Sequence, residues 1–300
     1  MPAKSGAAER PLAAALAEAG TKPETLTASG NDNRSAKKNW AQRFSNALAM
    51  TIADGLRPKY RGARVTPRPD GSGQEYSVGG RVDRKRTDVG VWDDAAGLVA
   101  GVSIKTYTFR DTHRATGTKL THIGRYVRNV KRNDMELRDE ADTLHRRQPY
   151  AVLTALFFMN EDACWDGIIG QSSFAHAVFT LRKRTGRNSP DGRFDLFEYV
   201  FIGLFDEVGH VRFFDVRQPP RMNQPPPDSD TISFEQLVEL IDDAVILRNT
   251  GVSRHERYAD PDDNWNPPVG SLPAGLEQED SLTLDEVIEN AGYPEAEDQP

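Results

Sequence analysis

Three side chains are spaced so that a pair of neighbouring strands would bring them together. Residues 98–106 have the composition of a strand, and because side chains alternate along a strand, Ser103 and Lys105 share one face. Residues 87–93 form a second strand-like run, and the short Asp-Ala-Ala-Gly connection between the runs favours a hairpin. If the hairpin turns at the two alanines, Asp88 lies directly across from Ser103. A slip of one residue would move Asp88 to the other face, so this prediction depends on the turn.

An aspartate beside a lysine suits the hydrolysis of a phosphodiester. The carboxylate of Asp88 would hold a divalent cation that polarises the phosphoryl oxygen, while the ammonium of Lys105 stabilises the developing charge. Ser103 would form a hydrogen bond nearby. The alternative is an exposed ion pair across a hairpin, which contributes little energy. These three residues alone leave both interpretations open.

Two helices are expected to pack beside this ribbon. The first begins at Ser35 and ends near Gly55, because large apolar residues recur at every fourth position: Trp40, Phe44, Leu48 and Ile52. The second covers residues 133–148 and begins with a capping box, in which Asn133 caps the helix and Glu136 completes the pair.

Further elements are predicted downstream of these helices. The apolar run 150–159 has the length and composition of a buried central strand. Residues 196–206 and 210–216 flank a Glu-Val-Gly turn and indicate a second hairpin, and a proline-rich connector then leads to a helix over 235–248. The alternation of helices and strands predicts an α/β fold.

Charge divides the chain into a basic part and an acidic part. Residues 34–148 hold 24 Lys and Arg against 13 Asp and Glu, whereas residues 149–300 hold 11 against 28. A basic block in a chain whose net charge is −7 indicates a polyanionic partner, and the alternative is a solvated basic face. We expect a flexible N-terminal segment (1–33), one folded domain (34–254) and an acidic, mostly disordered tail (255–300).

The basic residues are densest between residues 110 and 132. This segment has seven Lys and Arg against one Asp, with two glycines and little periodicity, which predicts a mobile loop that closes over a nucleic-acid duplex. The candidate DNA-binding residues are Arg110, Arg114, Lys119, Arg125, Arg128, Lys131 and Arg132.

The order of these elements resembles the PD-(D/E)XK nuclease superfamily, which includes many restriction endonucleases. The resemblance rests on Thr87-Asp88 and on Ser103-Ile104-Lys105, and it extends across about residues 35–250. It implies a restriction-endonuclease-like αβββαβ core with a central mixed sheet flanked by helices. It also implies that Asp88 and the carbonyl of Ile104 bind a metal ion, and that Lys105 assists the attacking water.

The sequence departs from the family pattern at two positions. Thr87 stands where the family has a proline before the aspartate, and Ser103 replaces the acidic metal ligand. Because a hydroxyl is a weak ligand, either another carboxylate completes the site or the site has lost its metal.

Two regions offer the missing carboxylate. On the helical wheel of residues 133–148, Glu140 borders the apolar stripe and Glu136 lies further round, and one of them is the expected substitute. The alternative is that Glu136 only caps the helix and that Glu140 pairs with an arginine. Glu75, which precedes the strand of Asp88, is a further candidate catalytic residue.

Taken with the resemblance, these residues predict a magnesium-dependent endonuclease that cuts double-stranded DNA in restriction or phage defence. Mn²⁺ is the alternative ion, and the expected partners are a second copy of the chain and a companion DNA methyltransferase. The alternative function is an inactive DNA-binding module that keeps the nuclease fold and is regulated by the acidic tail. A single cysteine, Cys164, and the lack of a long apolar run predict a cytoplasmic location without a membrane span.

Overall fold

The computed structural model describes residues 10–73, 76–78, 85–93, 97–114, 121–167 and 170–250. Several residues singled out above lie outside these ranges: Glu75, Lys119 and the acidic tail 255–300. The side chain of Arg114 also lies outside what the structure describes.

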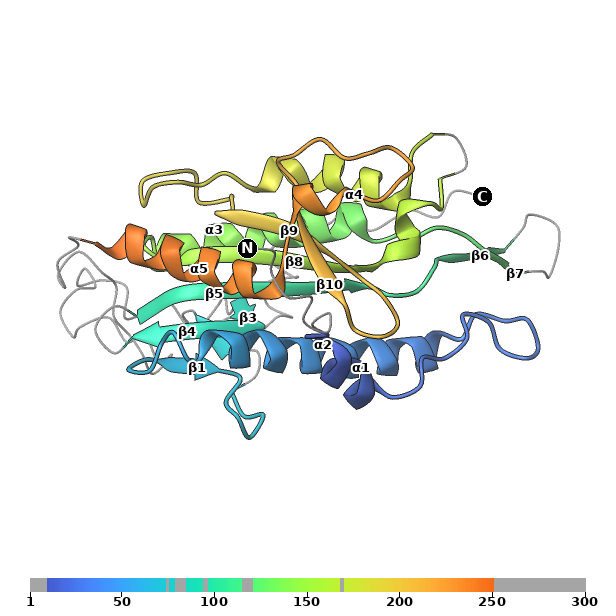
Figure 1. Ribbon diagram of the computed structural model, residues 1–300, viewed down its shortest axis with the longest axis horizontal. Coiled ribbons are helices and arrows are strands. Elements are labelled where there is room, and N and C mark those ends of the chain that lie inside the picture. Colours follow the sequence, from blue (N-terminus) through green and yellow to red (C-terminus); the bar gives the residue numbers. More distant parts are fainter. Residues whose placement is uncertain are drawn as a thin grey trace, which may run out of the picture. The chain divides into compact units, whose positions relative to one another are not determined.

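Within the described residues the protein is an α/β protein with a seven-stranded mixed sheet and five helices (Figure 1). The helices are α1 (Ala13–Ala19), α2 (Arg34–Leu56), α3 (Val130–Arg147), α4 (Ser173–Leu181) and α5 (Phe234–Asn249). In spatial order, the strands of the sheet are β1 (Arg64–Thr66), β4 (Val89–Asp93), β5 (Gly97–Tyr107), β8 (Val152–Asn160), β9 (Tyr199–Phe205), β10 (Val211–Asp215) and β11 (Thr231–Ile232). Two separate ribbons pair β2 (Tyr76–Val78) with β3 (Lys85–Thr87), and β6 (Thr112–Arg114) with β7 (Thr121–Ile123). Short 3₁₀ turns cover Glu161–Cys164 (η1), Arg182–Arg184 (η2) and Asp228–Asp230 (η3).

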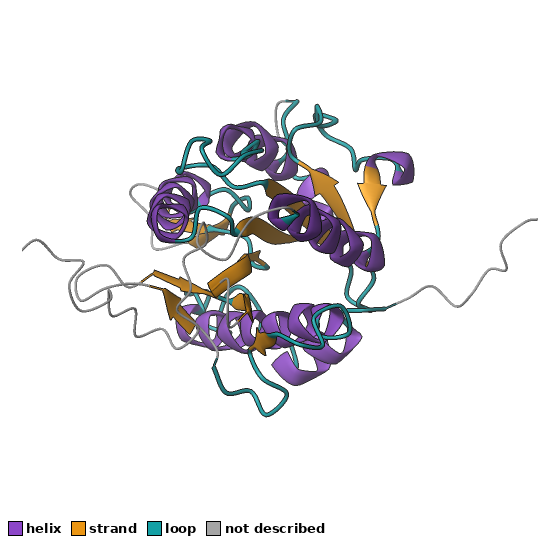
Figure 2. Ribbon diagram, turned by 90° about the vertical axis from the view of Figure 1, so that its left-hand side faces the viewer, coloured by secondary structure: helices purple, strands orange, loops and turns teal. Residues whose placement is uncertain are grey.

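Strands β5, β8 and β9 run parallel in the middle of the sheet, and the other neighbouring strands pair antiparallel. Helices lie on both sides of the strands (Figure 2). One hydrophobic cluster joins the sheet to α1, α2 and α5, and a second cluster joins it to α3 and α4. The predicted α/β class is therefore confirmed, and both faces of the central strands are buried.

The strongest sequence patterns correspond to the observed elements. Helix α2 buries its predicted stripe of Trp40, Phe44, Leu48 and Ile52, and it ends at Leu56, close to the predicted end. All nine residues of β8 are buried, as expected for a central strand. The β9–β10 hairpin and helix α5 also form where they were predicted. A helix over 173–181 and the edge strand at 64–66 were not predicted.

The N-terminal residues that the structure describes are not a flexible segment. Leu12 is fully buried, and its amide donates to the carbonyl of Gly209 at 3.1 Å. Trp40 Nε1 donates to the carbonyl of Gly20 at 2.8 Å, and the guanidinium of Arg43 donates to the carbonyl of Ala19 at 2.9 and 3.0 Å. The prediction for 1–33 is therefore wrong for residues 10–33, because few but large apolar contacts hold them to α2 and to the β9–β10 turn.

Helix α3 begins one turn earlier than predicted. Its first residue is Val130, which is fully buried, and Asn129 is the N-cap residue. Asn133 lies inside the helix and its side-chain amide donates to the hydroxyl of Tyr107. The predicted capping box is wrong, because packing of Val130 against the core extends the helix beyond the polar signal at Asn133.

The basic segment after residue 110 is not wholly a loop. Strands β6 and β7 form an antiparallel ribbon that continues beyond the end of β5, with His113 facing His122 (Figure 1). Asp111 anchors the base of this ribbon. Its carbonyl accepts from the amide of Gly124 at 2.7 Å, and its carboxylate accepts from the amide of Arg128 at 2.7 Å. The prediction of a mobile loop across the whole segment is therefore corrected. No helix in the described ranges is long and apolar enough to cross a membrane.

Candidate functional site

The β4–β5 hairpin has the predicted register at the end next to Asp88 and Ser103. Val89 faces Val102, and Val91 faces Ala100, which is the pairing that places Asp88 level with Ser103. Nearer the turn the register shifts by one residue between Val91 and Trp92. At this β-bulge Val99 of β5 is the additional residue, because Ala100 faces Val91 and Leu98 faces Trp92.

The bulge interrupts the strict alternation of side chains that was predicted for the strand at residues 98–106. Leu98 belongs to the cluster on the α3 side, whereas Val99 packs with Ala100, Val102 and Ile104 on the α2 side. Beyond the bulge, Ser103 lies on the face of β5 that α3 covers, which is the side of Glu140.

Asp88 lies in the bend between β3 and β4, level with the middle of β5. Its Oδ2 accepts a hydrogen bond from the amide of Ile104 at 2.6 Å. In an extended strand the N–H and C=O of one residue point to the same side, so the carbonyl of Ile104 faces the same edge of β5 as Asp88. The space for this approach comes from Gly101, because an added Cβ there would lie 3.0 Å from the methyl of Thr87 and 2.9 Å from Leu153.

Glu140 reaches the same segment of β5 from helix α3. The hydroxyl of Ser103 donates to Glu140 Oε2 at 3.1 Å, and the ammonium nitrogen of Lys105 lies 4.0 Å from the same oxygen. Leu137, Ala141 and Leu144 bury the adjacent stripe of α3 against the sheet, and Glu140 is only 7% exposed. A buried carboxylate is costly without donors or a cation, and Ser103 and Lys105 supply both.

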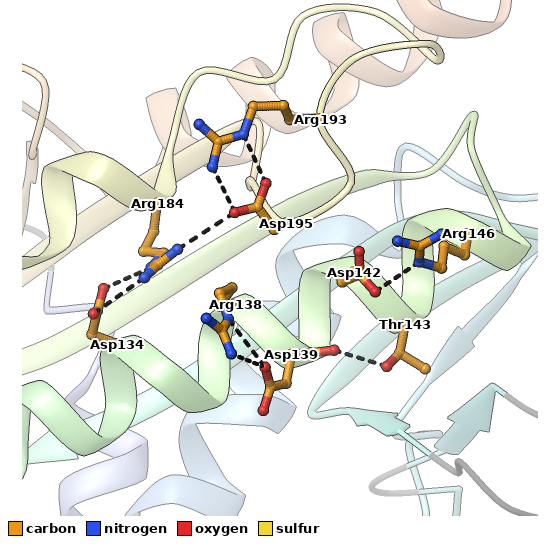
Figure 3. Close-up of polar contacts among 9 residues, drawn as sticks. All are labelled: Asp134, Arg138, Asp139, Asp142, Thr143, Arg146, Arg184, Arg193 and Asp195. Carbon is orange, nitrogen blue, oxygen red and sulfur yellow. Dashed lines mark hydrogen bonds and ion pairs between the residues drawn. The ribbon is translucent and has the colours of Figure 1, made fainter.

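Other acidic residues of α3 are occupied in ion pairs with basic side chains, as Figure 3 shows. Asp134 binds Arg184 at 2.7 Å, and Arg184 lies 3.6 Å from Asp195. Burial raises the pKa of Asp134, but the hydrogen bonds from Arg184 and Lys183 outweigh it and hold that pKa below its usual value. Asp139 and Asp142 pair with Arg138 and Arg146 of the same helix.

The structure separates the two glutamates that the sequence left open. Glu136 is 40% exposed and pairs with Arg132 at 2.7 Å, one turn before it on α3. Glu140 contacts Ser103 and lies near Lys105. The structure thus gathers Asp88, Ser103, Ile104, Lys105 and Glu140 around one short stretch of β5, and it leaves Glu136 outside this group.

The gathered groups form a set of hard oxygen donors. Two carboxylates and a strand carbonyl are ligands that Mg²⁺ accepts, because this ion keeps several waters and commonly binds only one or two carboxylates together with substrate phosphates. No group of three or more His, Cys, Asp or Glu side chains in the described ranges is arranged to hold a metal ion. Among the described residues the side chains alone therefore do not enclose a metal ion, and waters or a bound substrate would have to supply the remaining ligands.

A polar cavity of about 440 Å³ opens directly beyond Lys105. Its wall includes Thr106 and Tyr107 of β5, together with five cationic residues: Arg34, Lys37, Lys38, Arg110 and Arg128. The first three lie in the first two turns of α2. They were missed in the sequence, although their spacing of three and four residues places them on one helix face.

The other predicted DNA-binding residues have different surroundings. Arg125 donates to the carbonyl of Gln171 at 2.5 Å and lies 3.8 Å from Asp166, so it anchors the segment to α4. Arg132 is paired with Glu136, and Lys131 is exposed on α3. Only Arg110 and Arg128, of the predicted residues whose side chains are described, line the cavity beside the end of β5.

Two acidic residues, Asp32 and Asp111, are part of the wall of this cavity. The carboxylate of Asp32 binds Lys37 at 2.5 Å and Arg34 at 3.0 Å. Burial raises the pKa of Asp32, but these hydrogen bonds and one from Thr112 outweigh it, so the pKa lies below its usual value. Arg110 lies 3.5 Å from Asp162, which is outside the wall, and the five cations of the wall outnumber its two carboxylates.

Compared with models of protein families, with curated proteins and with solved structures, this chain has no match.

Proposed function

We propose that this protein is a magnesium-dependent endonuclease that hydrolyses phosphodiester bonds of double-stranded DNA. The observation that carries the proposal is the meeting of Asp88, Ser103, Lys105 and Glu140 on residues 103–105 of β5. The element order α2, β1, β4, β5, α3, β8, with these four strands adjacent in the sheet, supports a restriction-endonuclease-like αβββαβ core.

The metal ligands in this proposal are Asp88, Glu140 and the carbonyl of Ile104. The bound ion would supply Lewis-acid polarisation of the phosphoryl oxygen. Mn²⁺ accepts the same oxygen ligands and is the alternative ion. The protein's own contribution is to hold the two carboxylates on rigid elements, one beside a strand and one on a buried helix face.

Lys105 and Ser103 have separate roles in the proposal. The ammonium of Lys105 stabilises negative charge on the scissile phosphate and orients the attacking water, because it is a cation 24% exposed beside Glu140, on the strand whose next residues line the cavity. Ser103 is a positioning residue, since its hydroxyl donates to Glu140 and fixes the direction of that carboxylate. Glu140 in this way takes the place of the acidic residue that Ser103 replaces.

The cationic cavity beside β5 is proposed to bind the DNA backbone. Its wall places the guanidinium groups of Arg110 and Arg128 and the ammonium of Lys38 next to the strand that carries the site. Contacts of this kind hold phosphates and position the duplex without reading its sequence. A role in restriction or phage defence, action as a homodimer on both strands and a companion methyltransferase belong to the same proposal.

Supercoiled plasmid incubated with the full-length protein tests the proposal. We expect nicked and linear products with Mg²⁺ or Mn²⁺ and none with EDTA. Asp88→Asn, Lys105→Met and Glu140→Gln should each lower the rate by at least about 100-fold, the scale on which mutagenesis places charge-stabilising groups. Glu136→Gln is the matched control, because it removes a carboxylate one turn away on the same helix and should cut at the wild-type rate.

The alternative function is a DNA-binding module without cleavage. The observation that favours it is the small number of carboxylates, since no group of three potential metal ligands exists among the described residues. In that case the protein binds plasmid in a salt-sensitive manner, cuts nothing with either ion, and Lys105→Met and Glu140→Gln leave its affinity unchanged. Metal-dependent cleavage that Glu140→Gln abolishes and Glu136→Gln preserves excludes this alternative.

A further inference from the structure

A second cluster of ionisable residues lies away from the proposed nuclease site, where β8 and β9 begin. Its centre is Glu198, which is 4% exposed. The carboxylate accepts from the amide of Leu153 at 2.7 Å, from Arg187 at 2.9 Å and from Arg248 at 2.9 Å. His145 Nε2 lies 3.3 Å from Oε2 of the same carboxylate.

Cations outnumber the carboxylate in this cluster. The two guanidinium groups of Arg187 and Arg248 share Glu198, and each nitrogen of His145 faces an oxygen, Glu198 on one side and the carbonyl of Phe194 on the other. Asp191, whose charge also reaches Arg187, is an exposed residue.

Burial at this cluster opposes the positive charge. Desolvation lowers the pKa of Arg187, and the neighbouring charge of Arg248 lowers it further, against the opposing effect of Glu198. Arg187 Nε is buried and has no hydrogen-bond partner among the described residues. A buried donor and an excess of cations both favour a bound anion.

The cluster opens into a cavity of about 310 Å³. Arg187, Arg217 and Arg248 line it together with the polar residues Asn188 and Ser189 and the apolar side chain of Leu247. Arg217 lies at the surface, held by Asp215 at 2.8 Å and stacked over Tyr199 at 5.4 Å. The volume exceeds that of a single phosphate, and the apolar part of the wall leaves room for a small organic group.

We infer that this cavity is a binding site for a phosphate monoester, with the phosphate against Arg217 and Arg248 and a small organic group against the apolar wall. The three guanidinium groups of the wall outnumber the carboxylates of Glu198 and Asp215 that hold them, which favours an anion, and planar guanidinium groups bind phosphate through paired hydrogen bonds. The site is separate from the proposed nuclease site and does not depend on it.

Calorimetry on the full-length protein in EDTA tests the inference. The probes are inorganic phosphate, AMP and adenosine, together with a short single-stranded DNA that carries either a 5′-phosphate or a 5′-hydroxyl. AMP should bind more tightly than inorganic phosphate, and adenosine should not bind. Preference for the phosphorylated DNA end over AMP would identify a nucleic-acid terminus as the source of the phosphate, and the reverse order would identify a free nucleotide.

Arg217→Ala should weaken AMP binding by about 10- to 100-fold, as expected for the loss of a charge-assisted hydrogen bond. Arg193→Ala is the matched control. Arg193 is also exposed and is held by an aspartate two residues away, at 2.9 Å, but it does not line the cavity. Ser189→Asp, which adds a negative charge to the half-buried loop, should block binding while the thermal unfolding midpoint of the free protein stays near the wild-type value.

Three results would overturn the inference. The first is no heat with phosphate, AMP or either DNA end at about 10 mM for the small probes, where even weak sites bind. The second is equal affinity for AMP in Arg217→Ala and Arg193→Ala. The third is a rise in the thermal midpoint with phosphate that potassium chloride of the same ionic strength reproduces, because that would be general screening.

Discussion

Two places on the same sheet gather charge in opposite ways. At residues 103–105 of β5, the carboxylates of Asp88 and Glu140 lie beside a strand carbonyl and one ammonium. At the start of β8 and β9, two guanidinium groups and an imidazole surround the single carboxylate of Glu198. The first arrangement suits a bound cation and the second suits a bound anion, so the local ratio of charges, and not the net charge of the chain, indicates what each place binds.

The two places also differ in how their side chains are held. Glu198 accepts hydrogen bonds from the amide of Leu153 and from Arg187, pairs with Arg248 at 2.9 Å and is almost fully buried, so it is part of the folded core. Lys105 is partly exposed and lies 4.0 Å from its carboxylate, a distance at which an ion pair is weak. Substitutions at Glu198 should therefore act on stability, and substitutions around Lys105 should act on activity.

The largest effect on stability is expected from Glu198→Gln. Removing this charge leaves Arg187 and Arg248 buried without their carboxylate, and breaking a buried pair in this way costs about 3–5 kcal/mol. Urea unfolding followed by circular dichroism measures the loss. Asp142→Asn, which breaks an exposed pair with Arg146 on α3, is the control and should cost less than about 1 kcal/mol. Equal losses of unfolding free energy in the two variants would contradict the expectation that the buried ion pairs of Glu198 stabilise the protein more than an exposed pair.

The same residue should make stability depend on acid pH. Burial raises the pKa of Glu198, but His145, Arg248 and the amide of Leu153 outweigh it, so the folded-state pKa lies below its usual value. A lowered pKa contributes stability that is complete above the unfolded-state value near about 4.3 and is lost as pH falls towards the folded-state value. The difference in unfolding free energy between wild type and Glu198→Gln should therefore be constant from about pH 5 to 7 and shrink below it. A difference that grows on acidification would show that the carboxyl is protonated in the folded protein.

Ser103→Ala should reduce cleavage by a smaller factor than loss of Glu140. Without the hydroxyl, Glu140 keeps its charge but loses one buried donor, worth about 1 kcal/mol, or several-fold in rate. We expect kcat to fall while KM and the affinity for DNA in EDTA stay unchanged, because Ser103 does not face the cationic cavity. A change in KM alone would assign Ser103 to DNA binding and not to positioning.

The smallest effect is expected from Lys38→Ala in the cationic cavity. Loss of one phosphate contact should weaken DNA binding at all sequences alike and lower the salt slope of log affinity by about 1. Lys59→Ala is the control, since Lys59 lies just beyond the other end of α2 and pairs with Glu239 at 2.6 Å. The same slope in both variants would place the DNA elsewhere on the protein.

Local sequence patterns predicted the relative positions of Asp88, Ser103 and Glu140 in the candidate site. The strand alternation of β5 and the hairpin placed Asp88 level with Ser103, and the helical wheel placed Glu140 at the edge of the apolar stripe. These features depend on neighbours in sequence or on one helical period. The start of α3 was missed because burial of Val130 outweighs the polar signal at Asn133.

The cation-rich cluster was not visible in the sequence for a physical reason. His145, Arg187, Glu198 and Arg248 come from four separate elements, and no short-range spacing connects them. Only the parallel pairing of β8 with β9 and the return of α5 across the sheet bring them together. The three cationic residues of α2 in the cavity wall could have been predicted from the sequence, because Arg34, Lys37 and Lys38 share a helix face.

The β-bulge at Val91 and Trp92 lies between the turn of the β4–β5 hairpin and the end of the hairpin next to Asp88. The register of β4 with β5 shifts by one residue between Val91 and Trp92. The pairing from Val91 back to Val89 keeps the predicted register. A tag or a short graft inserted between Asp93 and Gly97 should therefore leave the pairing of Val89 to Val91 with β5, and with it the alignment of Asp88, unchanged.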